Sequence, residues 1–217
     1  MPLGPKAAYL GISLSRRYYS NRRLHKYVQW AQGNAARFAF LIGDNIYALT
    51  DSVFSDRTFS SALVVALERG REFCERIETI LIEESYTAEI IRWNELESHT
   101  EYQRLLSTFQ EEYMRRNSHF AQCVRQEVVG NLKRRLTDEV VKRFDSEEEP
   151  TSWNILDSYV LREMAGLITM SEYLGFSVEV YPGPDVGILN MLYKNVFPSL
   201  TNDLPETTKR EFISLSF

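Results

Sequence analysis

The apolar positions of the chain fall first into short runs of strand length. Such runs occupy 8–13, 38–42 and 89–93, and residues 176–181 alternate apolar with polar positions before a Pro-Gly-Pro turn. The run at 38–42 is uninterrupted, which is typical of a strand that is buried on both faces in a parallel sheet. We therefore predict four strands in these places.

Between and after these runs, apolar residues recur at helical spacing. Leu24, Tyr27, Val28 and Ala31 form one such stripe, the pattern of a helix with a single buried face. Asp44-Asn45, by contrast, is expected to open a loop, and Gly175 to end a long helix. By the same criterion we predict helices over residues 22–32, 58–84, 100–144, 153–174 and 186–194.

Strands and helices alternate along the chain, as they do in α/β proteins. This order predicts an open, mainly parallel central sheet that is flanked by helices and connected by right-handed crossovers. No internal repeat or linker divides the sequence, so we expect residues 1–217 to form a single domain. Function in such folds lies at the carboxyl ends of strands, which here means Ser13, Asp44 and Tyr181.

The composition is that of a globular protein. Apolar residues make up 44% and charged residues 25% of the 217 positions, and no apolar run approaches the ~20 residues of a membrane span. Cys74 and Cys123 are far apart, and the three histidines lack metal-ligand spacing. Since the first residues hold no apolar signal region, we expect a cytoplasmic protein with reduced thiols, no metal site and no membrane contact.

Charge is distributed unevenly along this acidic sequence. The net charge is −5, yet residues 1–37 hold seven Lys or Arg residues and no Asp or Glu. A second basic cluster consists of Lys133, Arg134 and Arg135. Local positive charge can bind phosphates even on an acidic protein. When charge alone is considered, however, solvated helix faces are the favoured explanation of such clusters.

Ser13 lies where the first strand gives way to a loop, directly after Gly11-Ile12. A serine in this place can be an exposed nucleophile, although a turn or capping serine is the more frequent case. The sequence has no GxSxG elbow and no histidine placed for a Ser-His-Asp triad. It also lacks the phosphate-binding patterns GxGxxG and GxxxxGK(S/T), which disfavours a dinucleotide enzyme and a P-loop ATPase.

Tyr159 and Glu163 lie four residues apart in a predicted helix, so their side chains project from the same face. A carboxylate beside a phenol can bind an amino group and move its proton. The spacing alone fits an ordinary pair on a helix surface as well. The apolar stretch that follows Glu163 favours an inward orientation of this face.

Taken together, these segments resemble three motifs of the cyclodipeptide synthases. Gly11-Ile12-Ser13, followed by Tyr18-Tyr19-Ser20, resembles the first motif of that family. The segment from Tyr159 to Glu163 resembles its Tyr-x-x-x-Glu helix, and Tyr181-Pro182 resembles its third motif. The order, spacing and chain length fit, and the likeness runs from about Ala8 to Tyr193.

The family has two branches, one of which carries Asn three residues after the serine and Gln after the late tyrosine. Arg16 and Pro182 occupy those positions here, so the chain resembles the other branch. The resemblance implies a Rossmann-like fold similar to the catalytic domains of class I tyrosyl- and tryptophanyl-tRNA synthetases. The HIGH and KMSKS signatures of those ATP-using enzymes are absent. This fits substrates that are already activated as tRNA esters, and no cofactor is expected.

The resemblance also implies a role for each motif. Ser13 would take the aminoacyl group of a first aminoacyl-tRNA, and a second aminoacyl-tRNA would complete a ping-pong reaction that yields a cyclic dipeptide. Tyr159 and Glu163 would hold the α-amino group, and Glu163 would move its proton. Tyr181 would hydrogen-bond the serine hydroxyl or a developing oxyanion.

Substrate-binding residues follow from family position. Tyr9, Gly11 and Leu41 are candidates for lining the first aminoacyl pocket, although Tyr9 and Leu41 fit plain core positions equally well. In the family the long helix after the second strand grips the tRNA acceptor stem with basic residues. Here that helix is interrupted by glutamates, so other basic segments, including the N-terminal arginines, are expected to share the task. The candidates for tRNA binding are Arg69, Arg71, Arg76, Lys133, Arg134 and Arg135.

Two alternative functions stay open at this point. A non-catalytic tRNA-binding protein of synthetase-like fold would keep a basic face, but it would not need the serine, the helical Tyr-Glu pair and the late tyrosine together. An unrelated hydrolase or transferase that uses Ser13 would need a His or Lys base, and no position suggests one. For the synthase we expect a monomer.

Overall fold

The computed structural model describes residues 6–14, 18–55, 57–115, 118–135, 150–201, 204 and 210–217, and the side chains of 132–135 and 150–153 lie outside that description. A central sheet of five parallel strands has the order β3-β2-β1-β4-β5. The predicted α/β fold of Rossmann-like type is therefore confirmed. The strands are β1 (Ala7–Ile12), β2 (Arg37–Ile42), β3 (Glu89–Arg92), β4 (Val178–Tyr181) and β5 (Glu211–Ser214).

The strand order changes direction at β1. From β1 the chain builds outward through β2 to β3, and it later returns to place β4 and β5 on the other side of β1. A crevice forms at the carboxyl ends of the strands that flank such a switch point. Ser13 follows β1 and Tyr181 ends β4, so the topology brings these two residues to the same crevice.

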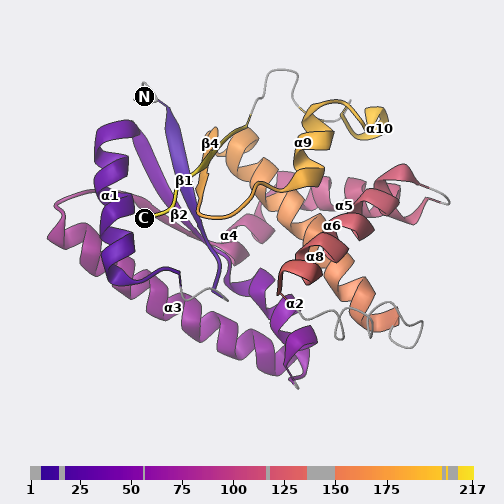
Figure 1. Ribbon diagram of the computed structural model, residues 1–217, viewed down its shortest axis with the longest axis horizontal. Helices are drawn as coiled ribbons and strands as arrows, with labels where there is room; N and C mark the ends of the chain where they lie inside the picture. Colours follow the sequence, from indigo (N-terminus) through magenta and orange to yellow (C-terminus); the bar gives the residue numbers. More distant parts are fainter. Residues whose placement is uncertain are drawn as a thin grey trace.

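Helices cover both faces of the sheet (Figure 1). α1 and α3 pack on one face, whereas α5, α6, α8 and α9 lie on the other. α8 continues into a π-helical turn, η1, and the helical stretch ends before Gly175, which has the φ of 77° that glycine adopts readily. The helical segments are α1 (Asn21–Asn34), α2 (Asp44–Phe54), α3 (Phe59–Glu83), α4 (Trp93–Ser98), α5 (Thr100–Met114), α6 (His119–Arg135), α8 (Pro150–Ile168), η1 (Thr169–Tyr173), α9 (Gly187–Tyr193) and α10 (Pro198–Thr201).

Alternation along the strands divides the core into two layers. Leu10 and Ile12 of β1 pack with residues of α1 and α3, whereas Tyr9 packs with the helices of the opposite face. The run Phe38–Ile42 is buried throughout, so β2 is covered on both faces as predicted. Among the described residues no helix is both long enough and apolar enough to cross a membrane.

Several local predictions differ from the structure. Asp44-Asn45 begins helix α2 rather than a loop, because the Asp44 carboxylate accepts the backbone N–H of Asn45 at 2.8 Å and favours the positive end of the helix. The third strand ends before Trp93, which starts α4. The predicted helix 100–144 is two helices, α5 and α6, and its last part from residue 136 lies outside the described residues.

Candidate active site

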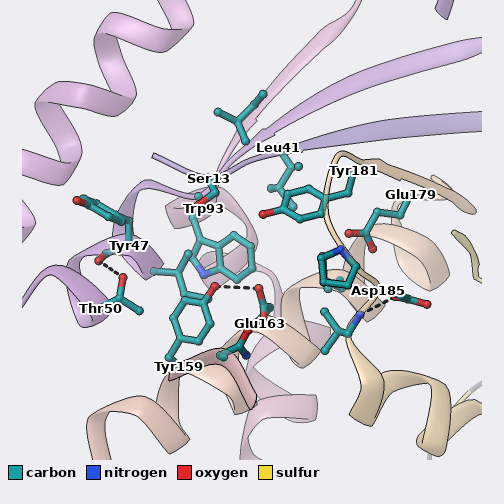
Figure 2. Close-up of a pocket in the computed structure, with 18 of the residues that line it drawn as sticks. Ser13, Leu41, Tyr47, Thr50, Trp93, Tyr159, Glu163, Glu179, Tyr181 and Asp185 are labelled. Carbon is teal, nitrogen blue, oxygen red and sulfur yellow. Dashed lines mark hydrogen bonds between the residues drawn. The ribbon is translucent and has the colours of Figure 1, made fainter. Parts of the chain in front are cut away.

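A cavity of about 110 Å³ opens at the carboxyl edge of the sheet, between the strand ends and helices α2, α6 and α8 (Figure 2). The ends of β1, β2 and β4 and the residues that directly follow β1, β2 and β3 contribute Gly11, Ile12, Ser13, Leu41, Gly43, Trp93, Glu179 and Tyr181 to its lining. Helices contribute Ile46, Tyr47, Thr50, Glu127, Asn131, Tyr159, Glu163 and Leu167, and the loop after β4 contributes Pro184, Asp185 and Val186.

Successive side chains of a strand alternate between the two faces of the sheet, and this alternation determines which strand side chains line the cavity. Gly11 and Ser13 point to the same face as Tyr9, and Glu179 and Tyr181 of β4 share that face. Leu10 pairs with Val180, so Gly11 and Tyr181 are the next neighbours toward the carboxyl end. A Cβ at Gly11 would lie 3.6 Å from Cδ2 of Tyr181, so the phenol ring packs directly over the glycine.

The strand end that carries Ser13 is fixed by the segment that follows it. Tyr19 is 2% exposed, and its hydroxyl donates a 2.7 Å hydrogen bond to the carbonyl of Gly11. Arg76 of α3 in turn donates through Nη2 to the carbonyl of Tyr19 at 2.7 Å. Tyr19, in the second half of the first motif, therefore ties this segment to the end of β1.

Helix α8 presents the second motif to the cavity. Tyr159 and Glu163 are half-buried and one turn apart, and the Tyr159 hydroxyl donates to Glu163 Oε1 at 2.9 Å. Both side chains rise from the helix toward the strand ends, and the Tyr181 phenol extends into the space between (Figure 2). The pair faces inward rather than lying on a helix surface, which is the orientation needed to hold an amino group near Ser13.

Trp93 forms a wall of the cavity and depends on a glycine of α8. A Cβ at Gly166 would lie 2.5 Å from Cη2 and 2.6 Å from Cζ2 of the indole ring, so only glycine lets the two elements approach. Trp93 is held from the other side by Asp44, which is fully buried and accepts its backbone N–H at 3.3 Å. Arg92 neutralises that carboxylate through Nε at 2.6 Å.

We expect Gly166→Ala to destabilise the protein by about 1–3 kcal/mol, the usual cost of overpacking a filled core. The matched control is Gly130→Ala in α6, where an added Cβ meets no atom within 4 Å. That change should be neutral or raise stability by up to ~1 kcal/mol through helix propensity. Denaturant unfolding of both variants measures the difference, and an equal effect of the two would contradict the contact with Trp93.

The ionisable groups that line the described cavity are all acidic. Glu127, Glu163, Glu179 and Asp185 contribute carboxylates, and no Lys, Arg or His is among the described lining residues. Such a cavity attracts a free ammonium group, because the Coulomb energy grows as solvent is excluded. Burial raises the pKa of Glu179, and the neighbouring Arg210 opposes that rise.

The structure brings most of the predicted site residues into this one cavity. Ser13, Tyr159, Glu163 and Tyr181 all line it, as do Gly11 and Leu41. Tyr9 instead lies fully buried beneath the cavity, where its hydroxyl donates to Glu179 at 2.9 Å. It therefore reaches the site through another side chain.

None of the basic candidates is among the described residues that line the cavity. Arg71 forms ion pairs with Glu68 and Glu75 on the exposed side of α3. Arg69 donates to the hydroxyl of Tyr47, a cavity residue, at 2.9 Å. Arg76 holds the loop after Ser13, as described above. Arg16 and the side chains of Lys133, Arg134 and Arg135 lie outside the described residues.

Several lining residues were not predicted from the sequence. Glu179 carried a recognisable signal, because it is a lone acid between valines, two residues before Tyr181 and thus on the same strand face. Glu127 and Asn131 are one turn apart on α6 and gave no such signal, since acidic and amide residues are common on helix surfaces.

A sequence model of the family described as cyclodipeptide synthase matches residues 6–201. A solved cyclodipeptide synthase (CDPS) from Staphylococcus haemolyticus is 18% identical with a TM-score of 0.75, covering 98% of this chain and 91% of the other. A CDPS from Fluoribacter dumoffii is 16% identical with a TM-score of 0.72, covering 92% and 85%.

A further similar structure is a cyclodipeptide synthase from Candidatus Glomeribacter gigasporarum that was solved bound to Phe-tRNAPhe. It is 17% identical with a TM-score of 0.64, and the match covers 94% of this chain and 87% of the other. No curated protein matches the sequence. At these identities the solved structures establish a shared fold, whereas the sequence model covers most of the chain.

Proposed function

Because this chain belongs to the cyclodipeptide synthase family, whose members are tRNA-dependent aminoacyltransferases, we propose that it joins the amino acids of two aminoacyl-tRNAs through an aminoacyl-enzyme on Ser13. One observation carries the proposal: a serine, a Tyr-Glu pair and a second tyrosine, distant in sequence, line a single cavity at the switch point of the sheet. Arg16 and Pro182 stand where one branch of the family has Asn and Gln, which supports membership in the other branch, the one with Tyr-Pro in its third motif.

The first step is acyl transfer to the serine. The Ser13 hydroxyl attacks the ester carbonyl of an aminoacyl-tRNA, a new ester forms on Oγ, and the ribose hydroxyl of the tRNA leaves with a proton. The tRNA ester is already an activated acyl donor, so this step needs no ATP. Tyr181 packs over Gly11 beside the nucleophile, where its phenol can donate to the oxyanion that develops on the carbonyl oxygen.

The second step forms the peptide bond. Tyr159 and Glu163 hold the α-amino group of the Ser13 ester, as the inward orientation of this pair allows. That amine attacks the ester carbonyl of a second aminoacyl-tRNA, the bond to the ribose oxygen breaks, and the tRNA leaves with a free ribose hydroxyl. Glu163 takes the proton that the amine loses. The product is a dipeptide that is still esterified to Ser13.

The third step closes the ring. The terminal amine of the dipeptide attacks the carbonyl of the Ser13 ester, which forms the second peptide bond and returns Oγ to its hydroxyl form. All four side chains belong to one chain and one cavity, so the reaction requires no second protomer.

Expression of the protein in a bacterium tests the proposal directly. We expect a 2,5-diketopiperazine in the medium by mass spectrometry, in amounts above those of a culture that carries an empty vector. Binding of aminoacyl-tRNA without any such product would favour the non-catalytic tRNA-binding alternative instead.

The proposal includes a tRNA partner, as in the relative that was solved with Phe-tRNAPhe. Arg71 is the most accessible described candidate on α3, with a side chain 53% exposed. Its pairs with Glu68 and Glu75 are surface pairs, and such pairs contribute only ~0–1 kcal/mol, so a phosphate can replace them. Arg76 is a poorer probe, because it also holds the loop after Ser13.

We therefore expect Arg71→Glu to lower kcat/KM for full-length aminoacyl-tRNA several-fold and to flatten its dependence on salt, since each phosphate contact releases counterions. Arg115→Glu, which reverses another exposed and glutamate-paired arginine at the end of α5, is the matched control. Kinetics at several salt concentrations measure both variants. If the rate is independent of salt and neither reversal matters, the RNA is held elsewhere, and the acid-free segment 6–37 is the next candidate.

A further inference from the structure

A carboxylate lies on the floor of the cavity, where the proposed mechanism has no use for it. Glu179 sits on β4 between Val178 and Val180, is 5% exposed, and faces the same side of the sheet as Tyr181. Its register partner on β1 is Tyr9, four residues before Ser13. The carboxylate thus lines the cavity two residues before Tyr181, toward the amino end of β4 (Figure 2).

One oxygen of this carboxylate takes all the contacts that Glu179 makes within the described residues. Oε2 accepts from the Tyr9 hydroxyl at 2.9 Å and from Nε of Arg210 at 2.8 Å, with Nη2 of Arg210 at 2.6 Å. None of these contacts involves Oε1. Because Glu179 lines the cavity, Oε1 is the acceptor that remains for a bound molecule.

The guanidinium that holds Glu179 is shared with a second carboxylate. The side chain of Arg210 is 1% exposed, and its Nη2 also lies 2.5 Å from Oδ1 of Asp185. Asp185 further accepts the backbone N–H of Val186 at 2.7 Å and Nδ2 of Asn190 at 2.8 Å. Two carboxylates against one guanidinium leave this floor with a net negative charge.

Stability gives little reason for this arrangement. Replacing a buried ion pair by apolar side chains of similar volume is often neutral or stabilising. An aliphatic residue at the position of Glu179 would give β4 an uninterrupted apolar run, like the run in β2. A buried acid that is oriented by a tyrosine and an arginine, with one oxygen left toward a cavity, has the form of a recognition group.

The fixed points of the aminoacyl-enzyme decide which part of the substrate meets this group. The ester lies on Ser13, and the α-amino group is held by Tyr159 and Glu163 on α8. The side chain of the bound amino acid is then directed toward the strands that form the floor of the cavity. The four residue steps from Tyr9 to Ser13 span roughly 13 Å along the strand. The Glu179 and Ser13 side chains cover part of that distance, and a long substrate side chain covers the rest.

We propose that Glu179, oriented by Tyr9 and Arg210, selects the amino acid that is transferred to Ser13, favouring a long side chain that ends in a hydrogen-bond donor, that is, a basic or amide side chain. The inference rests on the proposed role of Ser13. An aliphatic side chain would desolvate Oε1 without bonding it, and a carboxylate would meet net negative charge. Both are therefore disfavoured at the first step.

The test uses one tRNA that is charged in turn with glutamine, methionine, glutamate and lysine, so that the RNA is constant. Glutamine, methionine and glutamate have side chains of similar length. The glutamine side chain ends in a hydrogen-bond donor, the glutamate side chain ends in an anion, and the methionine side chain has neither a donor nor a charge. The rate of Ser13 ester formation is followed by intact-protein mass spectrometry. We expect glutamine and lysine to load at least ~10-fold faster than methionine and glutamate.

Two variants connect this preference to Glu179. Glu179→Gln keeps the shape and removes the charge, and it should lower the lysine-to-glutamate ratio at least ~10-fold. Glu179→Met/Arg210→Met removes both charges, so no guanidinium is left unpaired, and methionine should then load as fast as glutamine. Glu211→Gln on the neighbouring strand, whose carboxylate pairs with exposed Lys6 outside the cavity, should change neither ratio.

The possible results distinguish the specificity of Glu179 from the proposed function on which it rests. Equal loading of methionine and glutamine by the unmodified protein overturns the specificity inference, and so does an unchanged lysine-to-glutamate ratio in folded Glu179→Gln. Both outcomes leave the aminoacyl-enzyme in place. Failure of every amino acid to load Ser13 contradicts the proposed function itself, and the inference with it.

Discussion

Replacement of Ser13 by alanine is expected to abolish both the covalent loading of the protein and the formation of cyclic dipeptide. No other described hydroxyl or thiol in the cavity can take over, because the remaining candidates, Tyr47, Thr50, Tyr159 and Tyr181, are phenols or a hindered alcohol on other elements. Without the ester on Oγ, the α-amino group that Tyr159 and Glu163 hold has no anchor. Incubation with labelled aminoacyl-tRNA, followed by intact-protein mass spectrometry and product analysis, measures both losses.

The fold should survive this change. Ser13 is only half-buried and follows the last residue of β1, so its hydroxyl is not part of the core. The melting temperature of Ser13→Ala should therefore match that of the unmodified protein. Ser107→Ala, an exposed serine of α5, is the matched control and should retain full activity. Full activity in Ser13→Ala, or an aminoacyl label on another residue, would remove the central element of the mechanism.

The parts of this site that follow from local pattern were predictable from the sequence. Uninterrupted apolar residues at 38–42 required a strand covered on both faces, and the structure confirms one. The period of two along β1 and β4 places Ser13 and Tyr181 on the same face of the sheet. The period of 3.6 along α8 places Tyr159 and Glu163 on the same face of that helix. Parallel strands then bring their carboxyl ends to one edge of the sheet.

The parts that depend on distant partners could not be predicted. Strand β5 is four residues long, and its pairing with β4 comes from the sheet edge rather than from its own pattern. Arg210, directly before β5, meets Glu179 only because of that pairing. Helix α2 was missed because its first residue, Asp44, is a common turn residue, and its burial against Arg92 is a long-range contact.

Charge patterns were the least informative part of the sequence. Arg69, Arg71 and Arg76 lie on one helix, yet each has a different environment: a cavity tyrosine, two glutamates, and the loop after Ser13. The family resemblance made them candidates for tRNA binding, whereas their partners in the structure decide which of them can meet a phosphate. For this reason charge reversal at Arg71 tests RNA binding, whereas the same change at Arg76 would also remove its hydrogen bond to the carbonyl of Tyr19.

Replacement of Glu163 by glutamine is expected to leave loading of Ser13 largely intact and to slow dipeptide formation by ~10²–10⁴-fold, the usual contribution of one proton-transfer group. The amide keeps the size of the side chain and can still accept from the Tyr159 hydroxyl, which donates to Glu163 Oε1 at 2.9 Å. It cannot take the proton that the attacking amine must lose. Single-turnover measurement of the Ser13 ester and of its conversion to product separates the two steps.

Tyr159→Phe separates proton transfer from positioning in the same pair. The phenyl ring keeps its place on α8 but no longer holds the Glu163 carboxylate, so the second step should slow by a smaller factor than in Glu163→Gln. Glu111→Gln on the exposed side of α5 controls for the loss of a carboxylate elsewhere and should change neither step. If Glu163→Gln instead prevents loading of Ser13, the carboxylate acts in the first transfer, as the base that receives the serine proton. Glu127, Glu179 and Asp185 are then the described lining carboxylates left to test for holding the α-amino group.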